Sequence, residues 1–139
     1  MISIQTKKFT ERTAGHCDII DTTARIHEAI EKEHSLITAF VSGSTATLTT
    51  IESESRFIQD LKESVERLIP SDRPYHHDDR WDDDNGFSHF RAALFGPSIA
   101  LPVQNGKVCL GTWQQVILLD FDNRLRTQEI ILQLIGETE

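Results

Sequence analysis

The sequence has few positively charged residues and no long apolar run. Its 14 Lys and Arg residues are outnumbered by 22 Asp and Glu residues, which gives a formal net charge of −8 at pH 7. Nucleic acids and anionic membrane surfaces are bound by clustered basic residues, so this balance argues against both as partners. No apolar stretch approaches the roughly 18–20 residues that cross a bilayer. The N-terminus also lacks a signal-peptide pattern, so we expect a cytoplasmic protein.

Cysteine is scarce as well. The two cysteines, Cys17 and Cys109, are far apart and form neither a CxxC nor a zinc-finger pattern. In a chain without a secretion signal such cysteines are more often buried thiols than a disulfide, and we expect this of both. The 139 residues are 38% hydrophobic, which is enough for one core. We therefore expect a single domain over residues 1–139.

Residues that favour β-structure are concentrated at the two ends of the chain. They predict strands over residues 2–9, 17–21, 36–43, 44–51, 98–103, 107–112, 112–121 and 125–135. Gly43-Ser44 indicates a bend between two of these strands. Asn105-Gly106 predicts a tight hairpin, and residues 122–124 predict a second reverse turn.

Apolar residues three and four positions apart predict helices over residues 22–34, 53–69 and 88–94. Pro70 ends the second of these helices. The chain shows no βαβ alternation. The pattern therefore predicts an α+β fold of six to eight mostly antiparallel strands, with two main helices and a short one.

An acidic segment, expected to be a loop, runs from Ser71 to about Ser88. Three of the chain's six histidines, His76, His77 and His89, lie in it or just after it. Imidazoles bind borderline metals such as zinc, and carboxylates bind metals or orient an imidazole. A turn at Asn85-Gly86 would bring His89 back toward His77. The residues alone leave two interpretations open, a metal site or a solvated acidic loop.

Two further segments contain candidate site residues. In GSTATLTTIE, residues 43–52, hydroxyls and amides at a glycine bend could hold an anion, although threonine is also an ordinary strand residue. In LGTWQQ, residues 110–115, the tryptophan could form a pocket wall or belong to the core. The chain has no GxxxxGK[ST] or GxGxxG nucleotide loop and no GxSxG nucleophile elbow.

In this order the segments resemble the YjbQ-like family of small proteins, whose members are often described as secondary thiamine-phosphate synthases. The matching segments are GSTATLTTIE, the amphipathic helix, HD…W.D.NG..H, RAALFGPS and PVQNGKVCLGTWQQVILLDFD, so the resemblance covers nearly the whole chain. It implies a compact α+β fold with a sandwich-like core, a homotrimer, and a site for a divalent metal, commonly zinc, with magnesium as the other option.

The resemblance also implies residue roles. The expected metal ligands are His77 and His89, with His76 or Asp78 as a substitute where many relatives have a histidine and this chain has Gly43. The expected catalytic residues are Glu52, Asp78, Asn85 and Gln114. The expected contacts to a small anionic substrate are Ser44, Thr45, Arg91, Trp113 and Arg126.

Three functions are compatible with these residues. A thiamine-phosphate synthase would join a hydroxymethylpyrimidine diphosphate to a thiazole phosphate and release pyrophosphate, which needs charge stabilisation and exclusion of water. A hydrolase would use a metal-activated water with Asp78 or Glu52 as general base. A non-catalytic trimer would bind a metal or an anionic metabolite.

Overall fold

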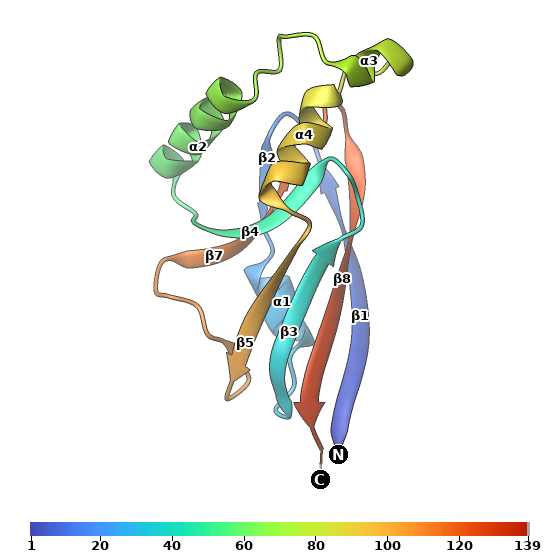
Figure 1. Ribbon diagram of the computed structural model, residues 1–139. Coiled ribbons are helices and arrows are strands. Elements are labelled where there is room, and N and C mark those ends of the chain that lie inside the picture. The colour runs from blue at the N-terminus through green and yellow to red at the C-terminus, as the bar shows by residue number, and fades with distance from the viewer. Residues whose placement is uncertain (139) are drawn as a thin grey trace.

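Two antiparallel β-sheets pack face to face around the main core, as Figure 1 shows for this computed structural model. The structure describes residues 1–138. The larger sheet has the strand order β1 (Ile2–Thr13), β8 (Arg126–Glu137), β3 (His34–Val41), β5 (Ser98–Gln104) and β6 (Lys107–Val108). The smaller sheet has the order β2 (Asp18–Asp21), β7 (Gln114–Asp120) and β4 (Ala46–Glu52). The expected α+β fold with a sandwich-like core is confirmed.

Strand β7 separates two hydrophobic cores. Its residues Val116 to Leu119 are all fully buried, because both faces of this central strand are covered. Val116 and Leu118 belong to the core between the two sheets. Ile117 and Leu119 belong to a second core that helices cover on the opposite face. An unbroken apolar run instead of an alternating one is the sequence pattern of such a strand.

The four helices are α1 (Thr23–Ala29), α2 (Ser55–Leu68), α3 (His76–Arg80) and α4 (Gly86–Phe95). The Glu54 carboxylate accepts hydrogen bonds from the backbone N–H groups of Arg56 and Phe57, which caps the N-terminus of α2. Val65 of α2 and Ala92 of α4 pack into the second core. The helix predicted up to Pro70 is confirmed, and no helix in residues 1–138 has the length and apolarity to span a bilayer.

Several predictions about local structure were wrong. The segment expected to be a loop contains α3 and the beginning of α4, the strand expected over residues 107–112 has two residues, and the helix expected over residues 22–34 has seven. Cys17 is buried as expected, but Cys109 is exposed. The hairpin at Asn105-Gly106 is confirmed, since φ is positive at both positions, at 53° and 75°.

Candidate functional site

Two histidines meet where α3 approaches the N-terminus of α4. The ring centroids of His77 and His89 are 4.6 Å apart, with 37° between the ring planes. Both rings line a cavity of about 630 Å³. The residues lining this cavity are Arg73, Pro74, Tyr75, His76, His77, Asp79, Gly86, His89 and Phe90. The acidic segment therefore forms a concave site that contains all three candidate imidazoles.

A glycine at the start of α4 allows this close approach. A Cβ at Gly86 would lie 2.8 Å from the Cβ of Tyr75 and 3.0 Å from Asp78 Oδ1, so a side chain there would push α3 away. The Gly86 N–H instead donates a hydrogen bond of 3.0 Å to Asp78 Oδ1. This bond joins the two helices and satisfies one of the free N–H groups at the beginning of α4.

Asp78 also determines how His77 is held. Its Oδ1 lies 3.2 Å from His77 Nδ1. A neutral imidazole that donates through Nδ1 keeps its lone pair on Nε2, and a carboxylate in this position also makes the ring a better metal ligand. His76 is different, because its side chain is fully exposed and its nearest acidic partner, Asp79, is 3.8 Å away. His77 and His89 are thus the better-positioned pair, and His76 is an exposed residue at the cavity edge.

Asp83 is a site residue that the sequence did not single out. His77, Asp78 and Asp83 each offer a ligand atom, and these atoms lie within 4.8 Å of one another. Asp83 is half-buried whereas its neighbours Asp82 and Asp84 are exposed. Of these three aspartates, the central one is therefore the one that turns toward the site. Three consecutive aspartates contain no sequence pattern that tells which one turns inward.

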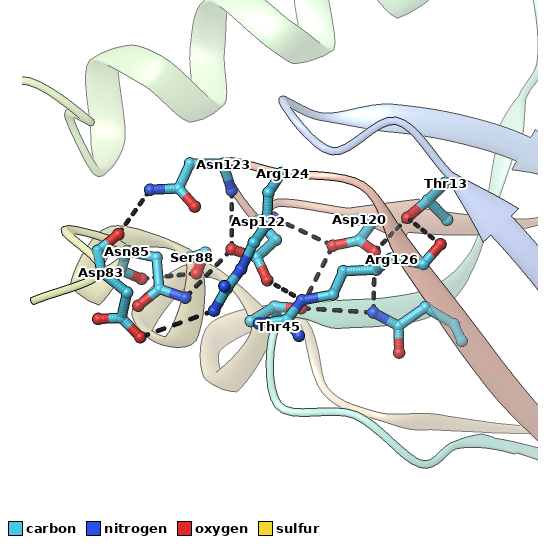
Figure 2. Close-up of polar contacts among 11 residues, drawn as sticks. Thr13, Thr45, Asp83, Asn85, Ser88, Asp120, Asp122, Asn123, Arg124 and Arg126 are labelled. Carbon is cyan, nitrogen blue, oxygen red and sulfur yellow. Dashed lines mark hydrogen bonds and ion pairs between the residues drawn. The ribbon is translucent and has the colours of Figure 1, made fainter. Parts of the chain in front are cut away.

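A network of buried polar groups lies behind the site and holds Asn85 (Figure 2). Asn85 Nδ2 donates to Asp122 Oδ1 over 3.1 Å, and Asp122 Oδ2 accepts from the guanidinium of Arg126. The neighbouring Asp120 accepts hydrogen bonds from the side chains of Thr13, Thr45 and Gln128. Asp120 and Asp122 are both completely buried.

The pKa of Asp122 reflects its hydrogen bonds more than its burial. Burial alone raises the pKa of this carboxyl group. Hydrogen bonds from Arg126, from Asn85 and from the backbone of Asn123, together with the charge of Arg126, outweigh that effect and leave the pKa below its usual value. Asp122 is therefore a stable anion that fixes the turn between β7 and β8 against the first residues of α4.

Three of the expected substrate contacts are engaged inside the fold. Thr45 is buried against Asp120, and Arg126 binds Asp122. Arg91 is 4% exposed and donates hydrogen bonds to the carbonyl of Ile69 and the carboxylate of Glu66. Their residue types suit phosphate binding, but in this chain they stabilise the packing of the helices and the β7–β8 turn. Ser44 is exposed and lies at the expected bend between β3 and β4.

The remaining predicted residues lie at the other end of the smaller sheet. Glu52 and Gln114 are register partners in β4 and β7, and Trp113, which precedes β7, is 74% exposed. Gln114 begins β7 and Asp120 ends it, so about 20 Å of strand separates Gln114 from the Asp120 network. Within one subunit the fold does not bring Glu52, Trp113 or Gln114 to the histidine pair.

The glycine at position 43 has a structural partner. A Cβ at Gly43 would lie 2.2 Å from Gln128 Oε1, and the same Gln128 side chain donates to Asp120 over 2.8 Å. A histidine here would require Gln128 to leave the buried network. The absence of a side chain at Gly43 thus leaves room for Gln128 in the buried network.

The whole chain is similar to known proteins. The family described as UPF0047 protein YjbQ-like matches residues 7–137. A UPF0047 protein of Archaeoglobus fulgidus is 34% identical over 128 residues, which cover 92% of this chain and 99% of the relative. A crystal structure of a YbjQ-like protein of unknown function from Sulfolobus solfataricus has a TM-score of 0.90 at 25% identity, covering 99% of this chain and 100% of that one. A hypothetical protein from Aeropyrum pernix has a TM-score of 0.86 at 27% identity, covering 96% and 99%.

Proposed function

The chain belongs to the YjbQ-like UPF0047 family, and we propose that it is a metal-dependent enzyme that hydrolyses a small phosphorylated metabolite. The observation that carries this proposal is the pair of imidazoles, 4.6 Å apart, in the wall of a cavity. His77 and His89 hold the metal, for which zinc suits imidazole ligands best and magnesium is the alternative. A metal with two protein ligands keeps positions open for water and substrate.

The residues around the pair fit such a metal. Asp78 Oδ1 lies 3.2 Å from His77 Nδ1, and the tautomer of His77 that donates this hydrogen bond leaves the lone pair on Nε2, as in the carboxylate–histidine pairs of known metal sites. When bound, the metal would polarise a phosphoryl oxygen and activate water. Asp78 has a further role in this arrangement, because it holds His77 and the beginning of α4 in one geometry.

The cavity suits one anionic group attached to a small organic body. Its volume of about 630 Å³ is within the range of small-molecule sites. Arg73 is the arginine in its lining, and its guanidinium lies 4.6 Å from the ring centroid of Tyr75. The guanidinium would bind a phosphate, and the rings of Tyr75 and Phe90 would pack against the rest of the metabolite.

Thiamine-phosphate synthase activity, the first function expected from the sequence, becomes the second candidate. It rests on the resemblance to the family, and it needs sites for both a diphosphate and a monophosphate. Thr45, Arg91 and Arg126, the residues expected to hold phosphates, are engaged in the fold. The cavity of one subunit therefore supports hydrolysis of one phosphorylated molecule better than the joining of two.

We also propose that the protein is a homotrimer, with the outer face of the larger sheet in the interface. Register partners place an apolar row across four strands of that face, formed by Ile4, Ile135, Leu36 and Pro102. In Figure 1 these strands lie in front, with α1 behind them. Sedimentation velocity tests this: Leu36→Glu should dissociate the trimer, whereas Leu68→Glu on α2 should leave it intact.

Activity assays on untagged protein distinguish the reactions. A panel of phosphate esters should yield free phosphate with added Zn²⁺ or Mg²⁺, with at least a tenfold loss in His89→Ala. Coupling of the two thiamine precursors without phosphatase activity would instead establish the synthase. Metal uptake with no turnover in either assay would contradict both and leave a binding protein.

A further inference from the structure

Two buried oxygen atoms just before α4 have no hydrogen-bond donor within residues 1–138. Asp83 Oδ1 and Asn85 Oδ1 are inaccessible to solvent and lack a hydrogen-bond donor within the described chain. Buried acceptors are almost always paired, because an unpaired one costs about 1–3 kcal/mol of stability. Two of them in neighbouring residues indicate that the fold keeps a place for something that supplies positive charge or donors.

The orientation of Asn85 is fixed by the network behind it. Asn85 is 1% exposed, and its Nδ2 is bound to Asp122. The opposite end of the carboxamide, its oxygen, must then face away from Asp122. In Figure 2 the Asn85 side chain lies between Asp122 and Asp83, with its oxygen on the side of the Asp83 carboxylate. Asn85 is thus a buried acceptor directed toward Asp83.

The charges near Asp83 are not balanced. Asp78 and Asp83 bring two negative charges, and Asp83 Oδ1 is 4.0 Å from His77 Nδ1. The arginine that reaches this group is Arg124, whose Nη2 lies 4.0 Å from Asp83 Oδ2 with its side chain about half exposed. By contrast, Asp122 is neutralised by Arg126 in direct contact. The site has an excess of negative charge where a cation would find oxygen ligands already in place.

We propose that Asp78, Asp83 and Asn85 bind a hard divalent cation, of the Ca²⁺ or Mn²⁺ type, at a second site that adjoins His77 and does not use His89. Carboxylate and carboxamide oxygens are the ligands such ions prefer, and water completes their coordination. Among the described residues, His77 and His89 line the cavity whereas Asp83 and Asn85 do not. Asp78 contacts His77 Nδ1, so the two sites adjoin, but the second site takes oxygen ligands and no imidazole.

Calcium titration of metal-free, untagged protein by isothermal calorimetry tests this site. One Ca²⁺ should bind per chain. Asp83→Asn should weaken binding at least tenfold, because it removes a charged ligand while keeping the shape of the side chain. Asp82→Asn, the same substitution at the exposed neighbour, should change affinity less than twofold. His89→Ala should also bind Ca²⁺ normally, even though it abolishes a zinc site in the cavity.

Thermal unfolding gives a second measurement that does not depend on calorimetric heat. Excess Ca²⁺ should raise the Tm of the wild type and of Asp82→Asn by similar amounts, and should raise the Tm of Asp83→Asn clearly less. Equal Ca²⁺ affinity in the two aspartate variants would overturn the proposal. Loss of Ca²⁺ binding in His89→Ala would also overturn it, because it would place the ion between the imidazoles.

Discussion

Two groups of acidic residues lie on either side of Asn85 and differ in burial and in hydrogen bonding. Asp120 and Asp122, which we call the closed cluster, are fully buried, and both oxygens of each carboxylate accept hydrogen bonds. Asp78 and Asp83, the open cluster, are half-buried and stand beside an imidazole, and Asp83 Oδ1 is unpaired within residues 1–138. The closed cluster stabilises the protein, and the open cluster leaves acceptors for a ligand.

The number of donors that the protein supplies to a carboxylate distinguishes structural from functional acidic residues in this fold. A carboxylate whose donors are all supplied by the protein has no capacity left for a metal or substrate. A carboxylate that is partly buried with few donors reduces stability until something binds it. Each prediction below exploits this contrast.

The largest effect is expected at Asp122. Asp122→Ala removes hydrogen bonds from Arg126, Asn85 and Asn123 in a completely buried place. The free energy of unfolding should fall by about 3 kcal/mol, since hydrogen bonds to charged groups contribute about 1.5–3 kcal/mol each and Arg126 can return to water. Urea denaturation at pH 7 measures this, and a loss below about 1 kcal/mol would contradict a stabilising role.

The thiol of Cys17 reports opening of the closed cluster. The cysteine follows His16, whose N–H donates to the carbonyl of Asp122, and burial raises the pKa of the thiol. Native labelling by a thiol reagent should be immediate at the exposed Cys109 and slow at Cys17. The slow phase should accelerate about tenfold or more in Asp122→Ala, because a less stable fold opens more often. An unchanged labelling rate of Cys17 in Asp122→Ala would show that exposure of this thiol does not depend on the closed cluster.

Lowering the pH should reduce the contribution of the closed cluster to the free energy of unfolding. The pKa of Asp122 is lowered by folding, so its contribution to stability is complete above the unfolded pKa of about 4 and is lost as the pH falls through the folded pKa. The difference in unfolding free energy between wild type and Asp122→Asn should be constant above about pH 5 and shrink below pH 4. A difference that persists unchanged at pH 3 would be inconsistent with this shift.

The smallest effect is expected at Asp83. Asp83→Ala removes an unpaired acceptor from metal-free protein, so the free energy of unfolding should not fall and should rise by up to about 1 kcal/mol, the low end of the cost of such an acceptor. The same urea experiment as for Asp122 measures it. A loss as large as that of Asp122→Ala would show that the two clusters are alike.

Periodic patterns made most of the fold predictable. The β-favouring residues of β1 and β8, the spacing of apolar residues in α2, and the Asn105-Gly106 turn depend on local sequence, and the structure confirms each. Helix α3 was missed because its residues, HHDDR, have no apolar periodicity. It depends on tertiary bonds instead, from the Tyr75 hydroxyl to the carbonyl of Pro70 and from Gly86 to Asp78.

The candidate site was predictable only at its ends. His77 and His89 were identified from residue type and a turn between them, and the structure places their rings together. Thr45 and Arg126 were expected to contact a substrate because of their residue types. Nothing in the local sequence shows that Thr45 donates a hydrogen bond to Asp120 and Arg126 to Asp122. Within one subunit Glu52 and Gln114 lie apart from the histidine pair, because strand register, which places them at the far end of β7, is a tertiary property that local sequence does not reveal.

The central claim is that His77 and His89 hold a metal, and zinc content tests it most directly. Untagged wild-type protein should bind one Zn²⁺ per chain after equilibration with excess zinc and dialysis. His77→Ala and His89→Ala should each lose at least nine-tenths of this zinc, while His76→Ala should keep most of it because its side chain is fully exposed. Zinc absent from the wild type, or retained in both His77→Ala and His89→Ala, would contradict the account.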